Sequence, residues 1–346
     1  MPIAAAWRGR RVLLTGHTGF KGGWLATWLQ SMGAEVFGFA LPPDPGSLGE
    51  MLGEAVRGTY GNVRDLASVQ AAMAAAWPSV VFHLAAQALV RRAYAEPLET
   101  LAANTMGTAH VLDAARRVPC IEAMVIVTTD KVYENREWNR AYRETDALGG
   151  HDPYSASKAA AELVTAAWSR SFLAALGVRV ASARAGNVVG GGDYAVDRLV
   201  PDCLRAFEAG TALHLRRPNA TRPWQHVLDP VCGYILLAEA LLRGDEAGGA
   251  WNFGPDAAEQ HEVADVVALM AELWGGGARV SIDAGPHPHE AGLLAVDAAE
   301  ARTRLGWRPA VPLRQALEWT IHWHRRHRAG ALARDLVLAD IERITA

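Results

Sequence analysis

The chain has 346 residues, of which 50% are hydrophobic and 21% are charged, and its formal net charge is −3. This composition is typical of a folded globular protein, and so small a net charge gives no reason to expect a nucleic-acid partner. The three cysteines lie far apart without a Cys-x-x-Cys pair, which argues against a zinc site or a disulfide framework.

Membrane and secretion signals are also missing from the sequence. No apolar run approaches the roughly 20 residues that a membrane-spanning helix needs. Charged residues and a strand pattern directly follow Ala4, Ala5 and Ala6, which is unlike a signal peptide. We therefore expect a cytoplasmic protein that has no membrane partner and no metal site.

The chain begins with a predicted strand, a glycine-rich turn and a predicted helix. Residues 11–14 form a short apolar run typical of a buried parallel strand, and a helical pattern then continues to Met32. Between them, Gly16 permits a tight turn, Gly19 lets the backbone approach a pyrophosphate, and Gly22 allows the helix to pack closely on the strand. An ordinary glycine-rich turn is the alternative. The strand before it and the helix after it favour a dinucleotide-binding loop.

Strands and helices alternate as far as residue 185. Further strands are predicted at residues 35–41, in a segment closing at 61–65, and at 80–84, 125–127 and 178–183. Helices are predicted up to residue 75 and over 98–117 and 154–176. This alternation predicts an α/β fold with a doubly wound, Rossmann-type parallel sheet. The second strand ends at Ala40 and Leu41, where such folds usually carry an acid for the adenosine ribose, so this position does not decide between NAD and NADP.

Beyond residue 185 the alternation stops. A glycine-rich loop covers residues 184–193, and short strands then mix with helices predicted at 201–209, 230–243, 263–274 and 313–327. We therefore predict a dinucleotide-binding domain over residues 1–185 and a smaller mixed α/β substrate-binding domain over residues 186–346. Residues 230–253 are expected to pack back on the sheet of the first domain.

Tyr154 and Lys158 lie four residues apart at the start of a predicted helix, so their side chains share one face. An ammonium near a phenol favours the phenolate and would lower its pKa from roughly 10 toward neutrality. A tyrosine of that kind can take the proton of a sugar hydroxyl while a nicotinamide takes the hydride. The alternative is an ordinary surface helix, since Tyr-x-x-x-Lys often occurs by chance. The glycine-rich turn upstream favours the catalytic interpretation.

Other polar and small residues follow the predicted strands. The strand at 125–127 leads into Thr128, Thr129, Asp130 and Lys131, and ligands bind beside the carboxyl ends of strands in open α/β sheets.

Two groups of histidines also need an interpretation. His324 and His327 share a helical face, but no cysteine or carboxylate completes a metal site there, so a solvated basic helix is favoured. His287 and His289 follow a predicted strand and could line the cleft.

Together these motifs resemble those of the extended short-chain dehydrogenase/reductases, from Trp7 to about Gly330. Within that family the chain is most similar to the nucleotide-sugar 4,6-dehydratases that act on CDP-glucose. The resemblance is carried by His17–Gly22, Thr129–Lys131, Arg184–Val188, Arg222–Val227 and His287–Glu290. Related dehydratases for dTDP-glucose or GDP-mannose usually carry glutamate where this chain has Lys131, and the enzymes for CDP-glucose carry lysine.

The resemblance implies NAD as the cofactor and a nucleotide-sugar as the substrate. The cofactor-binding residues would be Gly16, Thr18, Gly19, Phe20, Lys21, Gly22, Asn62, Val63, Leu84, Ala85, Ala86, Tyr154 and Lys158. The substrate-binding residues would be Gln87, Asn187, Arg198, Leu199, Val200, Arg217, Arg222 and His289. The chain departs from the family at Asn62, where aspartate is common, and at Gly292 and Leu293, where close relatives tend to carry histidine and tyrosine.

The implied reaction is the conversion of CDP-D-glucose to CDP-4-keto-6-deoxy-D-glucose, a hydro-lyase step in deoxysugar and O-antigen biosynthesis. Tyr154 would take the C4 hydroxyl proton as NAD takes the hydride, water would be lost across C5 and C6, and the hydride would return to C6. Thr129 would hydrogen-bond the C4 oxygen, and Asp130 would be the acid. Lys131 would be either a neutral base at C5 or a cation that stabilises the enolate.

Three alternatives stay open: a nucleotide-sugar 4-epimerase, a dehydratase of another nucleotide-hexose, and a non-catalytic dinucleotide sensor. Asp130 and Lys131 favour dehydration, because an epimerase needs no acid–base pair at C5 and C6. The presence of both Tyr154 and Lys158 argues against a sensor. The predicted helices at 98–117 and 154–176 match those that pair between subunits in the family, so we expect a homodimer at least.

Overall fold

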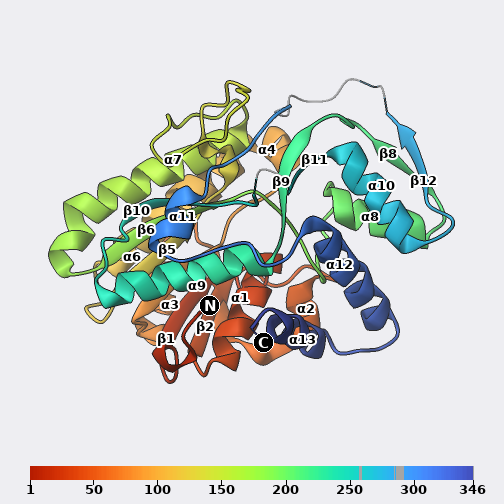
Figure 1. The fold of residues 1–346 in the computed structure, drawn as a ribbon. Helices are drawn as coiled ribbons and strands as arrows, with labels where there is room; N and C mark the ends of the chain where they lie inside the picture. Colours follow the sequence, from red (N-terminus) through yellow and green to blue (C-terminus); the bar gives the residue numbers. More distant parts are fainter. Residues whose placement is uncertain (257–258, 284, 286–291, 346) are drawn as a thin grey trace.

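A computed structural model describes residues 1–256, 259–283, 285 and 292–345. Its centre is a seven-stranded sheet with the order β10-β6-β5-β4-β1-β2-β3, in which every pairing is parallel (Figure 1). The strands are β1 Arg11–Thr15, β2 Glu35–Ala40, β3 Arg57–Tyr60, β4 Val80–His83, β5 Ala123–Val127, β6 Arg179–Ala185 and β10 Gly249–Phe253. The predicted Rossmann-type sheet is confirmed. Its order reverses between β1 and β4, which is where such folds bind their ligands.

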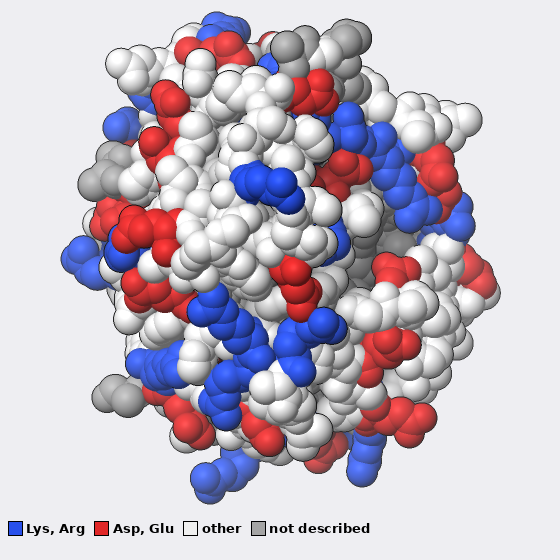
Figure 2. Space-filling view, turned by 90° about the vertical axis from the view of Figure 1, so that its right-hand side faces the viewer, with Lys and Arg blue, Asp and Glu red and all other residues white. Residues whose placement is uncertain are grey.

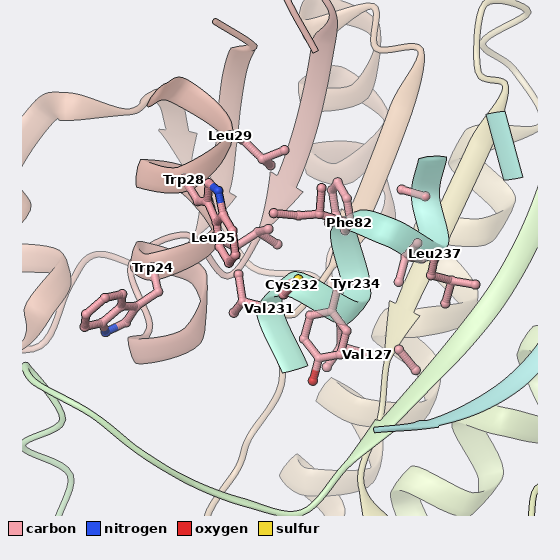
Figure 3. Close-up of a cluster of buried hydrophobic side chains, with 14 of the residues drawn as sticks. Trp24, Leu25, Trp28, Leu29, Phe82, Val127, Val231, Cys232, Tyr234 and Leu237 are labelled. Atoms are coloured by element: carbon pink, nitrogen blue, oxygen red, sulfur yellow. The ribbon is translucent and has the colours of Figure 1, made fainter. Parts of the chain in front are cut away.

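Side chains of the central strands alternate between two helical layers. From β1, Val12 and Leu14 belong to a buried cluster that also contains side chains of helices α1 (Phe20–Ser31) and α9 (Leu228–Arg243). Figure 3 shows part of this cluster, with Leu25 of α1 and Val231 of α9 among its members. Leu13, between them, packs on the opposite face with α3 (Leu66–Ala76) and α6 (Gly107–Ala115). Strands buried on both faces are continuous apolar runs, which is why they could be found in the sequence.

Four further helices belong to the part of the chain that forms the large sheet. They are α2 Leu48–Leu52, α4 Val90–Ala95, α5 Pro97–Leu101 and α7 Pro153–Trp168, with a π-helical turn at Ala102–Met106 between α5 and α6. Helix α7 packs against α4, α5 and α6 and contacts β6. The helices predicted at 98–117 and 154–176 therefore form one connected layer on this side of the sheet.

A smaller lobe is built from two short sheets and three helices. The sheets have the orders β11-β9-β7 and β12-β8. The elements are β7 Asn187–Val189, α8 Leu199–Glu208, β8 Ala212–Leu215, β9 Thr221–His226, β11 Gln260–Glu262, α10 Val263–Trp274, β12 Arg279–Ile282 and α12 Leu313–Arg328. They enclose a core of their own. Basic and acidic side chains are mixed over the face of the molecule seen in Figure 2.

Four later elements lie against the central sheet or its helices. Helix α9 contacts β5 and β6, strand β10 extends the sheet beside β6, and α11 (Ala299–Arg304) packs on β10. Helix α13 (Ala333–Thr345) belongs to the segment that we assigned to the substrate-binding domain, yet it packs on α1 and α2. Its buried Leu336, Val337 and Ile341 join the core that contains α1. The rest of the predicted division at residue 185 stays a prediction.

The basic helix expected around the histidine group is only partly exposed. Helix α12 carries several basic residues in its last turn, but His324 is buried beside the rings of Tyr194 and Trp274 and lies 3.4 Å from the Glu208 carboxylate. Burial lowers the pKa of His324. In the part of the chain that the structure describes, no group of three or more histidine, cysteine or acidic residues is arranged to hold a metal ion. No described helix is long and apolar enough to cross a membrane.

We expect Gly191→Ala to destabilise the protein by about 1–3 kcal/mol, because core overpacking typically costs that much. A Cβ at Gly191 would overlap the indole ring of Trp323 on α12, and the carbonyl of Gly191 accepts a hydrogen bond from Trp24 Nε1 at 3.1 Å. Chemical denaturation measures the loss. Gly276→Ala is the control, because a Cβ there would meet nothing within 4 Å. Equal stability of the two variants would contradict the packing of α12 on this loop.

Candidate active site

Residues after β5 form a hydrogen-bonded cluster at the carboxyl edge of the sheet. Thr129 Oγ1 donates to Asp130 Oδ1 at 2.9 Å, and Lys131 Nζ donates to the same oxygen at 2.9 Å. Lys131 Nζ also donates to Asn187 Oδ1, at the start of β7, at 3.3 Å. Asp130 is fully buried, whereas the Lys131 side chain is partly exposed. The structure therefore joins three predicted catalytic residues to one predicted substrate-binding residue.

The start of α7 places Tyr154 and Lys158 beside this cluster. Asp152 caps the helix by accepting from the backbone N–H groups of Tyr154 and Ser155 at 2.9 and 3.0 Å, and Pro153 occupies the first helical turn. Lys158 Nζ donates to the carbonyl oxygen of Val127 at 3.1 Å, which ties the helix to the end of β5. Tyr154 and Lys158 are both buried.

The predicted effect of Lys158 on Tyr154 is not what the structure shows. Burial raises the pKa of Tyr154 to about 12, and only a side-chain hydrogen bond with Thr129 and the charge of Arg198 oppose this rise. Burial lowers the pKa of Lys158 to about 8. The expectation that Lys158 brings the pKa of Tyr154 toward neutrality is therefore wrong for this structure. Desolvation of the phenol dominates, and the ammonium is directed at the Val127 carbonyl.

Lys21 adds a further cation that the sequence had assigned only to the phosphate-binding turn. The pKa of Lys21 is lowered to about 7, mainly because the side chain is buried and next because of the charge of Arg198. The charges of Lys158 and Lys131 lower this pKa further, and the charge of Asp130 opposes the shift. Lys21 thus interacts with three other cationic side chains, those of Arg198, Lys158 and Lys131, and with the carboxylate of Asp130. Such a concentration of positive charge suits ligands that carry phosphates.

The glycine-rich turn has the shape that a dinucleotide requires. Gly16 has φ +78°, and a Cβ there would lie 2.7 Å from the backbone nitrogen of Ala85. Gly19 caps α1, which leaves the first N–H groups of the helix free to meet phosphate oxygens. A Cβ on Gly22 would overlap the carbonyl of Gly16. These close approaches fit a dinucleotide pyrophosphate. They also explain why Leu84 and Ala85 lie against the turn.

Residues near the ends of β2 and β3 surround the expected adenosine position. Thr18 Oγ1 donates to the carbonyl of Leu41 at 3.0 Å, and the His17 ring stacks on Tyr60 with a centroid distance of 6.4 Å. Burial lowers the pKa of His17. Asn62 Oδ1 accepts from Arg64 N at 3.0 Å.

The other predicted cofactor residues follow the carboxyl ends of strands β1, β3 and β4. Phe20 opens α1, Val63 is buried under α6, and Ala86 follows β4.

The predicted substrate residues do not all reach the catalytic cluster. Arg198 is ion-paired with buried Asp193 at 2.9 Å and interacts electrostatically with Tyr154, which places it in the cluster. Gln87 is held by hydrogen bonds, donating to Thr100 Oγ1 at 2.9 Å.

The remaining substrate residues belong to the smaller lobe. Leu199 and Val200 start α8, Arg217 follows β8, and Arg222 on β9 donates to the carbonyl of Thr221 at 2.9 Å. His289 and the His287–Glu290 motif lie outside the described residues.

A buried ion pair behind the cluster was missed in the sequence analysis. Glu162 accepts from Arg184 Nε and Nη2 at 3.0 and 2.9 Å, from Ser182 Oγ at 2.6 Å, and from Thr128 Oγ1. These contacts bind α7 to β5 and β6. The sequence offered one signal for this pair, because Glu162 and Arg184 each lie inside an otherwise apolar segment. Charged side chains are rarely buried unless they are paired, so two such residues indicate a buried ion pair.

Comparisons with known proteins agree with this geometry. Residues 13–320 match the GDP-mannose 4,6-dehydratase family. The CDP-glucose 4,6-dehydratase of Salmonella typhimurium is 46% identical over 328 residues, covering 92% of this chain and 91% of that enzyme. The UDP-glucose 4-epimerase of Thermotoga maritima, solved with UDP-glucose, has the same fold, with a TM-score of 0.82, 22% identity and coverage of 92% and 99%. MoeE5 in complex with UDP-glucose and NAD gives a TM-score of 0.78 at 26% identity, with coverage of 92% and 99%.

We expect Glu162→Ala to cost about 3–5 kcal/mol of stability, because it leaves the Arg184 guanidinium buried without its carboxylate. Both side chains of this pair are at most 4% exposed. Urea denaturation measures the change. The control is Glu318→Ala, which removes an exposed pair with Arg314 on α12 and should change stability by roughly 0.5 kcal/mol or less. A loss no larger than that of the control would mean that Glu162 does not hold the helix to the sheet.

Proposed function

The chain belongs to the GDP-mannose 4,6-dehydratase family, and we propose that it dehydrates CDP-D-glucose to CDP-4-keto-6-deoxy-D-glucose with NAD as its cofactor. The observation that carries the proposal is the joining of Tyr154 and Thr129 to Asp130 and Lys131 in one hydrogen-bonded cluster. The first pair suits oxidation at C4, and the second suits loss of water across C5 and C6. The 46% identity to a CDP-glucose dehydratase supports the cytidine nucleotide.

NAD is supported by the turn between β1 and α1 and by the NAD found in the complex of MoeE5. A bound NAD supplies a hydride acceptor that can give the hydride back. The residues that would hold it are those of the turn, with Tyr154 and Lys158 at the nicotinamide ribose. Ala40 and Leu41 at the end of β2 bring no basic side chain for the 2′-phosphate of NADP, and burial keeps the pKa of His17 low.

Oxidation at C4 needs a group that takes the hydroxyl proton. Tyr154 is placed for this role, since its phenol shares a hydrogen bond with Thr129 and interacts electrostatically with the cation of Arg198. Burial holds the phenol protonated, so the cationic surroundings and the bound substrate must stabilise the phenolate during the step. Thr129 can hydrogen-bond the same C4 oxygen and so orient it.

Dehydration needs a base at C5 and an acid at C6 at the same time. Lys131 Nζ and Asp130 Oδ1 are 2.9 Å apart. Moving one proton across this contact turns an ion pair into a neutral amine and a carboxylic acid. We propose that these forms act, with the amine removing the C5 proton and the acid protonating the departing C6 hydroxyl.

A homodimer is proposed from a group of exposed apolar side chains on neighbouring helices. They are Leu98 and Leu101 of α5, Met106 of the following π-helical turn, and Leu163 of α7. Leu98 is 80% exposed and Leu163 is 62% exposed. Because α5 and the π-helical turn both contact α7, these side chains belong to one helical layer. A second copy of this layer would cover them. A role in deoxysugar and O-antigen biosynthesis and a cytoplasmic location stay predictions.

The substrate is tested by incubating the protein with NAD and, in turn, with CDP-, dTDP-, UDP- and GDP-glucose, with mass detection of water loss. We expect dehydration of CDP-glucose, and substrate deuterated at C4 should give product deuterated at C6. An epimerised sugar that has lost no water would support the epimerase, and no turnover with any sugar would support the sensor. Deuterium that accumulates on free NADH would indicate a simple dehydrogenase.

The same assay tests the assignment of Lys131. Lys131→Ala should still reduce bound NAD on mixing with substrate and then stall, because only the C5 step lacks its base. Loss of the first hydride transfer would mean that Lys131 binds the sugar or the cofactor and is not the base.

We expect Leu163→Glu to convert the dimer to a monomer, because it places a charge inside the proposed apolar contact. Sedimentation should give a dimer for the wild type and 37.1 kDa for the variant. Leu332→Glu is the control, since Leu332 is also exposed but lies between α12 and α13. A monomeric wild type, or a dimer that Leu163→Glu leaves intact, would contradict the proposed interface.

A further inference from the structure

Two buried polar atoms beside the cluster have no hydrogen-bond partner among the described residues: Oδ2 of Asp130 and the hydroxyl of Tyr234. We propose that the Tyr234 hydroxyl donates a hydrogen bond to Oδ2 of Asp130 during the reaction and stabilises the carboxylate that forms when Asp130 gives up its proton. Tyr234 is then a positioning residue for the acid. The inference rests on the proposed function, because it needs Asp130 to act as the acid.

Asp130 meets its other partners through one oxygen only. Oδ1 accepts from Thr129 Oγ1 and from Lys131 Nζ, both at 2.9 Å. Oδ2 lies close to Gly186, which in turn lies close to Pro223. A Cβ on Gly186 would lie 3.0 Å from Oδ2 and 3.0 Å from the carbonyl oxygen of Pro223. Neither neighbour offers a side-chain donor, and a carbonyl oxygen can only accept. A donor for Oδ2 must therefore come from another element.

Tyr234 comes from α9, which packs against the ends of β5 and β6. Figure 3 shows its ring near Val127, the last residue of β5, from which the chain runs on to Asp130. The ring is fully buried and packs edge-to-face on Phe253, with a centroid distance of 5.7 Å. The phenol interacts electrostatically with Tyr154 and Asp130. Its position thus relates it to the catalytic cluster and not to solvent.

The protonation state of Tyr234 suits a donor. Burial raises its pKa, and the charges of Tyr154 and Asp130 raise it further, so the hydroxyl keeps its proton while Asp130 loses one. In the dehydration step the amine of Lys131 takes the C5 proton, the C5–H electrons form the C5–C6 double bond, the proton of Asp130 goes to the C6 oxygen, and water leaves. Negative charge returns to Asp130 at that moment. A preorganised donor at Oδ2 stabilises that charge where water cannot.

The packing alone does not explain a tyrosine at this position. Phenylalanine would fill the same space against Phe253 without burying a hydroxyl that has no partner, and such a hydroxyl costs stability. A purely structural Tyr234 therefore predicts that Tyr234→Phe leaves turnover unchanged and makes the protein as stable or more stable. A role in the acid step predicts the same stability but slower dehydration.

The test is Tyr234→Phe, mixed with NAD and CDP-glucose while NADH absorbance and product are followed together. We expect the first hydride transfer at the wild-type rate, accumulation of bound NADH, and product formation slowed by roughly 10- to 100-fold, somewhat below the loss of a direct oxyanion donor. The thermal midpoint should not fall. In an Asp130→Asn background, Tyr234→Phe should have no further effect on product formation, because no carboxylate then forms.

Tyr133→Phe is the matched control. Tyr133 is equally buried, but its hydroxyl donates to Asn252 Oδ1 at 2.7 Å and accepts from Arg184 Nη1 at 2.9 Å. This variant should lose thermal stability without accumulating NADH.

Three outcomes would overturn the inference. One is a Tyr234→Phe variant with wild-type turnover and no NADH accumulation, and another is an unchanged effect in the Asp130→Asn background. The third is a clear loss of folding in Tyr234→Phe, which would show that the hydroxyl has a structural partner. Any of these leaves the proposed function standing if the wild type dehydrates CDP-glucose. If the wild type dehydrates no nucleotide-sugar, the proposed function fails and this inference fails with it.

Discussion

The carboxylate of Glu162 holds together the elements on which the site depends. It binds Arg184 of β6 at two points and accepts from Thr128 at the end of β5. Glu162 lies one turn after Lys158 on α7. The contacts of Glu162 therefore also fix the position of the Lys158 side of the helix relative to the ends of the strands. A buried ion pair adds little net stability, since desolvation offsets most of the attraction. Its contribution here is geometric, and the site owes its fixed shape to it.

Around that fixed frame the site carries an imbalance of charge. Lys21 interacts with Lys131, Lys158, Arg198 and Asp130, and burial lowers the pKa of both Lys21 and Lys158. Positive charges gathered in one place attract anions, and burial weakens the hold of Lys21 and Lys158 on their protons. Such an arrangement suits ligands that carry phosphates.

Local patterns made the sheet and part of the site predictable. Continuous apolar runs mark strands that helices cover on both sides, and Tyr154 and Lys158 can be paired because a helix brings residues four apart to one face. What escaped prediction depends on contacts between distant segments. The return of α9 to the sheet was expected, but not that it would bring the Tyr234 side chain near Asp130, and the packing of α13 on α1 was not expected either. The prediction of a lowered pKa for Tyr154 was wrong because burial raises this pKa, and no local sequence pattern reveals the burial of a side chain.

The order of strands has a consequence for how the chain is made. Strand β10 pairs with β6 at one edge of the sheet, and α13 packs on α1. Both of these elements come from the last third of the chain. A ribosome releases them long after β1 to β6 have emerged. Until then the nascent protein must carry an open strand edge and an uncovered apolar helix, the two features that most readily recruit other chains. Chains that end before α13 should therefore depend on chaperones to a degree that the finished protein does not.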